Sequence, residues 1–320
     1  MTTVSHDNRT NMVPPAERLT HVLPTATLAE NGRPRKPFRD ELYAIPNLRN
    51  AFTVAFLWVQ SLGVVIAACL LHNPIVWVIA FMLMSRACVL HAILGHEAAH
   101  RLLFTNKAAN DLVGRWLVGY PMWFVLDGYR RVHMAHHRDE FGPNEPDIAY
   151  YRGYPITKAS WRRKLFRDAV GISGYKNLRG FFMGWSNAER RRSAISVLAW
   201  QAALMIGFTV AGYPLAWPLL WFLPWMTSWR VMNRLRAVAE HGGMIRSDDR
   251  RETTHHIEQH WLARFWIVPY NTGWHLAHHV DSGVPFRALP RLHRELVDAQ
   301  WVTPEITHRN YLRFWRTCVR

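Results

Sequence analysis

Three short motifs hold eight of the 18 histidines in this 320-residue chain: HEAAH (96–100), HMAHH (133–137) and HLAHH (275–279). On a helix, residues separated by three or four positions lie on one face, so each motif directs two or three imidazoles the same way. Imidazoles without a cluster of thiolates or carboxylates suit iron, zinc or copper. The spacing therefore predicts a site for two metal ions, bound by these eight histidines and one more, for which His241 is the best placed.

Other histidines fit this pattern less well. His91 precedes His96 by five residues, which rotates it about 140° around a helix and away from the motif. His255, His256 and His260 form a separate cluster among polar residues. We expect that cluster to be a solvated face, although an exchange of one of its members with His241 stays open.

A membrane zinc protease is an alternative interpretation of the first motif. H-E-x-x-H binds zinc through its two histidines and uses the glutamate, here Glu97, as a general base. Leu126-Asp127-Gly128 resembles the third-ligand motif of intramembrane proteases. This interpretation leaves the six histidines of the other two motifs without a role. One zinc per chain would favour the protease, and two irons an oxygen-activating enzyme. A non-catalytic haem or metal carrier is a further alternative.

Long apolar segments must position these motifs. Ala51 to Leu71 is free of charge and spans about 31 Å as a helix, the thickness of a bilayer core. A second apolar segment follows, and an uncharged segment from 193 to 229 breaks naturally at Gly212-Tyr213-Pro214. We expect four spans in two hairpins, at about 51–71, 74–94, 193–211 and 214–230. The segment 112–126 is too short to cross and is expected to be interfacial or re-entrant.

The charge distribution predicts the topology. The chain has 39 Lys+Arg against 23 Asp+Glu, a net charge of +16 that by itself suggests nucleic-acid binding. All but one of the basic residues fall in 1–50, 95–192 and 230–320, and the tight hairpin turns have none. By the positive-inside rule, both termini and the central segment are cytoplasmic. We therefore expect no nucleic-acid partner, a polar N-terminal arm over 1–50 and one membrane domain over 51–320.

Several motifs together resemble the integral-membrane fatty acid desaturase and hydroxylase superfamily. They are GHEAAH (95–100), HMAHH (133–137), AEH (239–241), NTGWHLAHH (271–279) and the tail VPFRALPRLHREL (284–296). The resemblance covers about residues 50 to 296 and implies an all-α membrane protein: four transmembrane helices in two hairpins, with a cytoplasmic helical cap that holds a dinuclear iron site. The implied ligands are His96, His100, His133, His136, His137, His241, His275, His278 and His279.

The chain departs from the family pattern at two places. Some relatives have an asparagine four residues before the lone histidine, where this chain has Ala237. Acyl desaturases often follow the third motif with an aromatic residue and a proline, whereas this chain has Val280-Asp281-Ser282. NTGWH is closer to the sphingolipid desaturase variant, so the substrate class stays open.

The resemblance implies an enzyme that uses O2 to remove hydrogens from an unactivated acyl chain of a membrane lipid. Glu97, Asn271 and Asp147 are candidates for orienting the ligand imidazoles. The three cysteines form no C-x-x-C, and the chain lacks a flavin or cytochrome b5-like module, so electrons must come from a ferredoxin, rubredoxin or cytochrome b5 type of donor with its reductase. A hydroxylase or ketolase acting on acyl chains, alkanes or carotenoids is the alternative.

Overall fold

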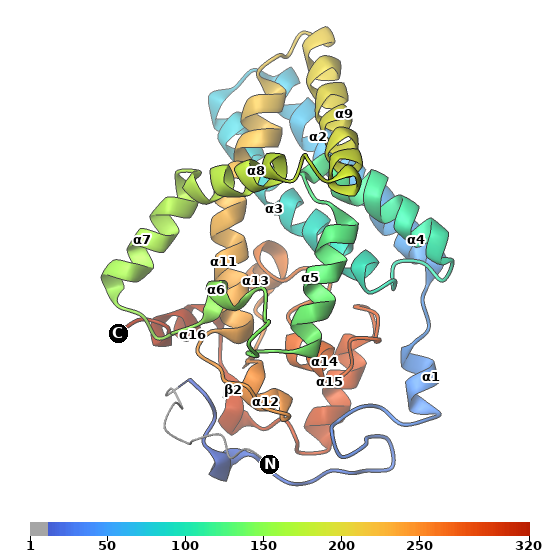
Figure 1. Cartoon of the computed structure of the whole chain (residues 1–320), viewed down its shortest axis with the longest axis vertical. Helices are drawn as coiled ribbons and strands as arrows, with labels where there is room; N and C mark the ends of the chain where they lie inside the picture. Colours follow the sequence, from blue (N-terminus) through green and yellow to red (C-terminus); the bar gives the residue numbers. More distant parts are fainter. Residues whose placement is uncertain (1–11) are drawn as a thin grey trace. The chain divides into compact units, whose positions relative to one another are not determined.

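A computed structural model describes residues 12–320, which are mostly helical and divide into two compact units (Figure 1). The hydrophobic unit comprises Ile45–Arg131 and Arg163–Asn233, and the histidine unit comprises 12–44, Val132–Arg162 and Arg234–Arg320. Each unit is described by itself below. Among the described residues the strands are limited to two short ones, in agreement with an all-α fold class.

The hydrophobic unit contains the long helices. Three helical segments of residues 12–320 are long and apolar enough to cross a membrane: Phe38–Leu71, which includes α2, Pro74–Ala99 (α3) and Ala188–Val210 (α9). Helices α2, α3 and α9 belong to this unit. Its elements are α2 (Asn47–Leu71), α3 (Pro74–Ala99), α4 (Lys107–Val113), η3 (Gly114–Gly119), η4 (Tyr120–Met122), α8 (Ile172–Met183), α9 (Ala188–Val210), η5 (Trp217–Phe222) and α10 (Leu223–Met226). Three more helices, α5 (Leu126–Arg138), α7 (Lys158–Ala169) and α11 (Ser228–His241), begin in one unit and end in the other.

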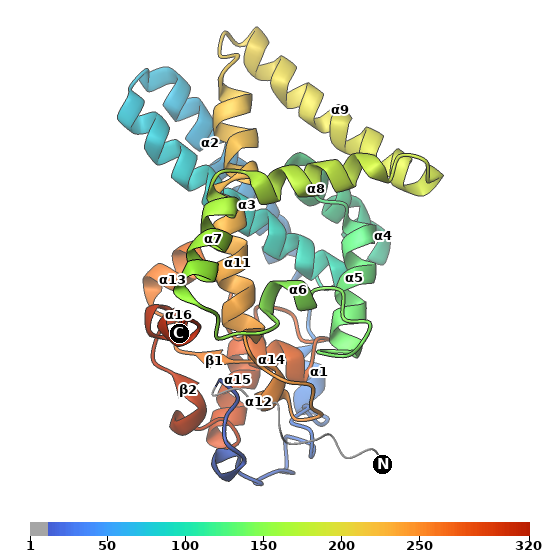
Figure 2. The same ribbon diagram turned by 60° about the vertical axis from the view of Figure 1, so that its left-hand side comes forward.

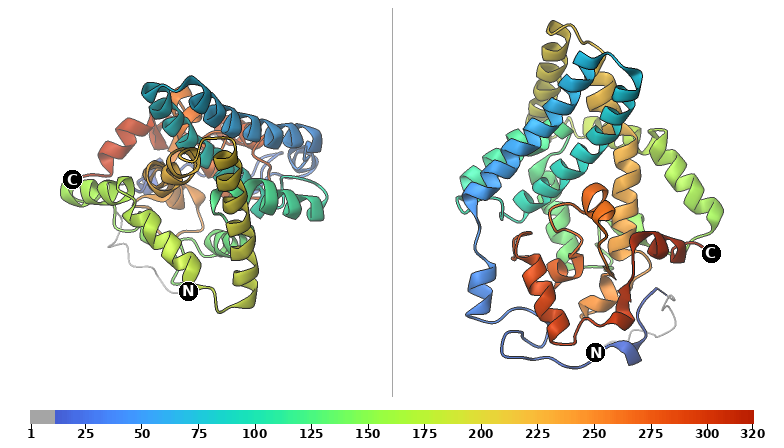
Figure 3. Two further views of the ribbon diagram at one scale, coloured as in Figure 1. Left: turned by 90° about the horizontal axis from the view of Figure 1, so that it is seen from above. Right: turned by 180° about the vertical axis from the view of Figure 1, so that it is seen from behind.

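The first two expected spans lie within α2 and α3, which form a hairpin and lie side by side (Figure 3). His72 ends α2 in a left-handed conformation, and the side chain of Asn73 accepts a hydrogen bond from the Ile75 N–H to start α3. Pro74 occupies the first turn of α3, where its missing N–H costs nothing. Helix α3 continues past the expected boundary at 94, so the first histidine motif lies in its last turn.

The second expected hairpin is less regular. Helix α9 contains most of the expected span 193–211, but 214–230 is divided among the π-helical η5, the short α10 and the start of α11. Pro218 and Pro224 lie in this region and donate no backbone hydrogen bonds. Thr227 interrupts the helical geometry between α10 and α11, with φ −120° and ψ −92°. A fourth crossing therefore stays a prediction.

The segment expected to be re-entrant, 112–126, is not a regular helix. It passes through the π-helical η3 and the 3₁₀-helical η4, so several of its carbonyl groups need partners outside the segment. Side chains from α2, α3, α9 and η5 donate to these carbonyls. The pairs are Trp58 Nε1 to Leu117 O (2.8 Å), His91 Nδ1 to Val118 O (2.8 Å), Gln201 Nε2 to Tyr120 O and Pro121 O (3.0 and 2.9 Å) and Trp221 Nε1 to Pro121 O (2.8 Å). His91 thus has a structural partner.

The histidine unit is built from short elements. They are η2 (Ala16–Arg18), α1 (Phe38–Leu42), α6 (Ile148–Tyr151), α12 (Arg250–Thr253), β1 (His256–Ile257), α13 (Trp261–Trp266), α14 (His275–Val280), α15 (Leu289–Asp298), η6 (Pro304–Ile306), β2 (Thr307–His308) and α16 (Tyr311–Thr317). Strands β1 and β2 pair in parallel, with His256 opposite Thr307. Val238, Ile257 and Phe314 are central members of its apolar core.

The predicted N-terminal arm, 1–50, lies partly outside the described residues. From residue 12 onward the chain packs into the histidine unit, where Leu28 and Leu42 are fully buried. The Tyr43 hydroxyl lies 2.8 Å from both carboxylate oxygens of Asp281, directly after α14. Asp281 therefore fixes the end of α14 to the N-terminal segment.

We predict that Gln201→Leu destabilises the protein by about 1–3 kcal/mol, because two buried carbonyls of the re-entrant segment lose their donor. The thermal unfolding midpoint in detergent should fall by several degrees. Met205→Leu on the same helix is a matched control, because Met205 is exposed and the substitution conserves volume. Equal midpoints for the two variants would contradict the role of Gln201.

Candidate metal centre

Four helices provide the predicted ligands. His133, His136 and His137 lie on α5, His275, His278 and His279 on α14, His241 at the end of α11, and His96 and His100 at the end of α3. Seven of these nine histidines belong to the histidine unit. Most of the seven are at least nine-tenths buried, so they contribute imidazoles to an interior rather than to a solvated face.

The seven histidines converge through one nitrogen each. Nε2 of His137 lies 3.1 Å from Nε2 of both His133 and His278. Nε2 of His275 lies 3.1 Å from that of His241 and 3.0 Å from that of His279. Nitrogen atoms of His136, His241 and His279 also lie within 4.8 Å of one another. The two sets meet at His137 and His279, whose rings stack with centroids 4.4 Å apart.

This spacing fits metal ligation. Two nitrogen donors at about 2.1 Å from one ion are about 3.0 Å apart when the angle between them is ~90°, and about 3.4 Å apart in a tetrahedral site. The observed separations of 3.0 and 3.1 Å match the smaller value. Neutral imidazoles with no thiolate among them are a donor set that suits iron, zinc or copper. The converging imidazole nitrogens therefore fit bound metal, which these histidines would hold.

The second ring nitrogen is hydrogen-bonded to protein in three of these histidines and lies near a carboxylate in a fourth. The His279 Nδ1–H donates to Glu140 Oε1 (2.6 Å), and the His136 Nδ1–H lies 3.0 Å from both oxygens of Glu145. The His241 Nδ1–H donates to the Thr253 carbonyl (2.9 Å), and His275 Nδ1 lies 3.6 Å from Glu240 Oε1. Such contacts fix the tautomer and orient the ring, so that Nε2 is left free for a metal.

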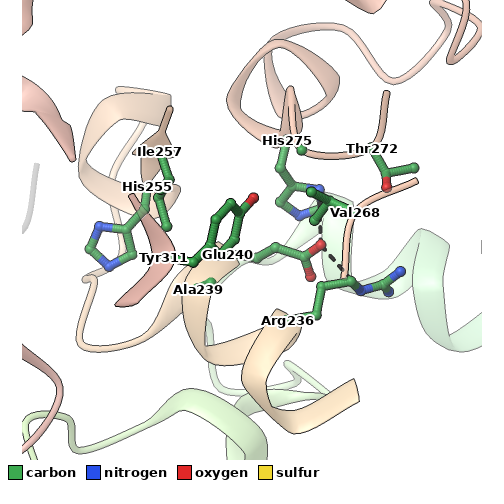
Figure 4. A pocket seen from close by; sticks show the side chains of 10 residues that line it. Arg236, Ala239, Glu240, His255, Ile257, Val268, Thr272, His275 and Tyr311 are labelled. Atoms are coloured by element: carbon green, nitrogen blue, oxygen red, sulfur yellow. Dashed lines mark ion pairs between the residues drawn. The ribbon is translucent and has the colours of Figure 1, made fainter. Parts of the chain in front are cut away.

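Two arginines hold the carboxylates in place. Arg250 Nη1 lies 2.7 Å from Glu140 Oε1, and Arg236 Nε lies 3.3 Å from Glu240 Oε1. Figure 4 shows Glu240 between His275 and Arg236 at the edge of a small pocket that Thr272 and Tyr311 also line. The arginines compensate the charge of carboxylates that are themselves buried.

Burial favours the neutral form of three of these imidazoles. It lowers the pKa of His241, His275 and His279 well below the usual value of a histidine. Burial alone would also lower the pKa of His136, but the hydrogen bond and charge of Glu145 outweigh it and raise that pKa. A neutral imidazole is the form that binds a metal.

The first motif lies in the hydrophobic unit. His96 and His100 have ring centroids 4.7 Å apart, as expected for two residues one turn apart on α3. Glu97, between them, is buried, and its backbone carbonyl accepts a hydrogen bond from the Leu102 N–H. Asp127, the third-ligand candidate of the protease interpretation, instead pairs with Arg115 through two hydrogen bonds of 2.7 and 2.8 Å.

The other two predicted orienting residues are near the site without a direct hydrogen bond to a histidine. The Asp147 N–H donates to Glu145 Oε1, so this residue supports the carboxylate that binds His136. Asn271 has a left-handed conformation before α14, and its side-chain oxygen accepts from Arg264. Their roles as orienting residues stay predictions.

Sequence reasoning missed Glu140, Glu145 and Glu240. Glu140 and Glu145 follow the second motif by three and eight residues, and Glu240 directly precedes His241. The only signal was their nearness in sequence to the motifs, in a chain with few acidic residues. Their partners, His279 for Glu140 and His275 for Glu240, are far away along the chain, so only the fold assigns them.

The cluster expected to be a solvated face is mostly buried. His255 and His256 are about 95% buried, whereas His260 is exposed and begins α13. The expectation was wrong for His255 and His256, because the pairing of β1 with β2 places them in the interior of the histidine unit. His255 Nε2 donates to the Gly242 carbonyl (2.7 Å), and His256 stacks on His293, which stacks on Trp274. His241, rather than a member of this cluster, is one of the seven converging histidines.

Comparison with known proteins agrees with this arrangement. The model of the family described as Fatty acid desaturase matches residues 71–309, which include all nine histidines. The chain therefore belongs to the fatty acid desaturase family, a family of membrane oxidoreductases. No curated protein matches the chain.

We predict that Glu140→Gln and Glu240→Gln each weaken metal binding about 10–100-fold while every candidate ligand remains. Each variant removes the negative charge beside the Nδ1 atom of a candidate ligand, His279 or His275, and so makes its Nε2 a weaker donor to a metal. Metal content after dialysis against graded chelator measures the effect. Glu258→Gln is the control, because Glu258 is an exposed residue of the same unit. Unchanged affinity in both test variants would contradict the assignment.

We predict that the metal-free protein loses stability as the pH falls below about 6.5. Burial lowers the pKa of His255 and His256 to about 3 and that of His293 to about 4. Between these values and about 6.5 the unfolded chain binds protons that the folded chain does not, which costs about 1.4 kcal/mol per pH unit for each histidine.

Thermal midpoints measured from pH 7.5 to 5.0 test this dependence. His293→Phe should flatten it, because the ring still stacks on Trp274 but no longer titrates. His21→Gln, at an exposed position, should leave it unchanged. A dependence as steep in His293→Phe as in the parent protein would contradict the prediction.

Proposed function

We propose that the chain is an O2-dependent fatty acyl lipid desaturase with a histidine-ligated di-iron centre. The observation that supports this most strongly is the convergence of seven histidines: nitrogens of six lie 3.0–3.1 Å from one another, and His136 joins two of them within 4.8 Å. The opposite ring nitrogen of three is hydrogen-bonded to protein. The proposal requires His96 and His100, on α3, to complete a set of nine ligands. It also requires both termini and the histidine unit to be cytoplasmic, with four spans.

An unactivated methylene has neither an acidic proton nor a leaving group, so side-chain acid–base chemistry cannot attack it. Two bound irons would supply the activation of O2 and the removal of hydrogen from the chain. The protein's own residues orient this chemistry and exclude water from it. Glu140 and Glu145 accept the Nδ1 protons of His279 and His136, Glu240 lies 3.6 Å from His275 Nδ1, and burial favours the neutral form of His241 and His279.

The reaction also needs electrons from outside the chain. Its composition provides no flavin or iron–sulfur motif, so we propose a separate donor of the ferredoxin, rubredoxin or cytochrome b5 type. The excess of basic residues would favour an acidic donor through electrostatic attraction.

Of the two alternative functions, the observations leave one open and disfavour the other. A hydroxylase or ketolase acting on acyl chains, alkanes or carotenoids uses the same metal ligands and differs only in the fate of the substrate radical. A zinc protease is disfavoured, because it explains neither the family membership nor the seven converging histidines. In addition, its candidate third ligand, Asp127, is paired with Arg115. We favour desaturation because of the tail 284–296.

Expression in a host without its own desaturase, followed by lipid mass spectrometry, tests the activity. Loss of two hydrogens from an acyl chain supports the proposal. Gain of one oxygen identifies a hydroxylase instead. Metal analysis of the purified protein separates both from the protease: two irons per chain are expected, whereas a single zinc would exclude the di-iron centre.

We predict that His136→Ala lowers the iron content to one ion or fewer per chain and abolishes turnover, because it removes a buried donor together with the contact to Glu145. His260→Ala is the matched control, since His260 is exposed and begins a helix away from the cluster. Retention of two irons and full turnover in His136→Ala would show that this ligand assignment is wrong.

A further inference from the structure

Helix α8 has three distinct faces. Gly174, Leu178 and Phe181 face the protein: a side chain at Gly174 would collide with the Met226 backbone, and Phe181 packs edge-to-face against Trp123. Ser173 and Asn177 form a polar face. The third face is exposed and mostly apolar; we call it the α8 surface. It consists of Ile172, Tyr175, Lys176, Arg179, Phe182 and Met183, all of them exposed.

The spacing of the apolar residues on the α8 surface is helical. Ile172, Tyr175, Phe182 and Met183 are separated by 3, 7 and 1 positions, which places them along one side of a helix. Met183 is 69% exposed and Tyr175 61%. Large apolar side chains gathered on one exposed helix face indicate a partner or a membrane.

The position of α8 in the chain favours a membrane. Only residues 184–187 separate it from α9, one of the three helices able to cross a membrane (Figure 2). Near the start of α9, Glu189 is followed by the exposed Arg190, Arg191 and Arg192, and residues 193–210 of that helix have no charge. The membrane surface therefore falls near Arg192, and a four-residue link holds the end of α8 within a few residues' length of it.

Charge identifies the kind of lipid. Residues 169–188 contain no aspartate or glutamate, while Lys176 and Arg179 lie among the apolar side chains of the α8 surface. Long basic side chains can bury their stems beside apolar neighbours and extend their charged ends to lipid phosphates. An acidic protein partner would satisfy the charges but would not by itself explain the apolar side chains between them.

We propose that α8 lies in the plane of the membrane interface and that the α8 surface binds anionic phospholipid headgroups. Ile172, Tyr175, Phe182 and Met183 would enter the boundary of the acyl chains, and Lys176 and Arg179 would contact the phosphates. This inference rests on the membrane location in the proposed function and not on its catalysis. It can therefore be tested in metal-free as well as in metal-loaded protein.

The first experiment measures the depth of α8. Nitroxide labels are attached at Met183→Cys and, as the matched control on the polar face, at Asn177→Cys, in the full chain reconstituted into nanodiscs. The three native cysteines are buried, which limits background labelling. We expect the label at 183 to be accessible to O2 and protected from a water-soluble nickel reagent, and the label at 177 to show the reverse. Equal accessibility of both labels to the nickel reagent would overturn the proposal.

The second experiment measures lipid preference. Spin-labelled phosphatidylglycerol and phosphatidylcholine are compared for immobilisation by the parent chain and by the double variant Lys176→Glu/Arg179→Glu. Each basic residue near a charged membrane strengthens binding about fivefold, so the affinity of this surface for the anionic lipid should fall about 30-fold or more.

Arg313→Glu/Arg316→Glu is the matched control, because it reverses two exposed charges with the same spacing on α16. The control should retain the parent's lipid preference. An equal loss in both double variants would show that the lipid preference depends only on net charge, and would overturn the proposal. So would an unchanged preference in the α8 variant, especially if an acidic protein lost its binding to that variant instead.

Discussion

The structure depends on one requirement: a buried imidazole has two ring nitrogens, and each needs a partner. In the histidine unit, seven imidazoles gather where there is little access for water. Their Nε2 atoms lie close to one another, an arrangement that a cation can satisfy. The Nδ1 atoms therefore need acceptors from the protein, because an unpaired buried polar group costs about 1–3 kcal/mol.

This requirement explains the polar residues around the site. Glu140 and Glu145 bind His279 and His136, and the Thr253 carbonyl binds His241. A buried carboxylate needs a positive partner in turn, which Arg250 provides for Glu140. Tyr43 extends the same logic to the end of α14, where Asp281 anchors the helix that bears the third motif.

The hydrophobic unit meets a similar requirement with different groups. The irregular η3 and η4 leave backbone carbonyls without helical partners, and an apolar environment offers no water to replace them. Indole, imidazole and amide N–H groups from Trp58, His91 and Gln201 donate to them. These side chains look out of place within apolar helices when the sequence is read alone, and the carbonyls explain them.

The sequence by itself determined the features that depend on local spacing. Motif histidines three and four positions apart must share a helix face, and uncharged segments such as 51–71 form long helices because they satisfy their own backbone. The family and the candidate ligands followed from these patterns.

Only the tertiary structure decided which distant groups meet. It paired Glu140 with His279, drew His255 and His256 into the interior, and divided 214–230 among three elements. No local periodicity encodes such contacts, because each depends on how the helices pack and on which buried charges find partners when they do.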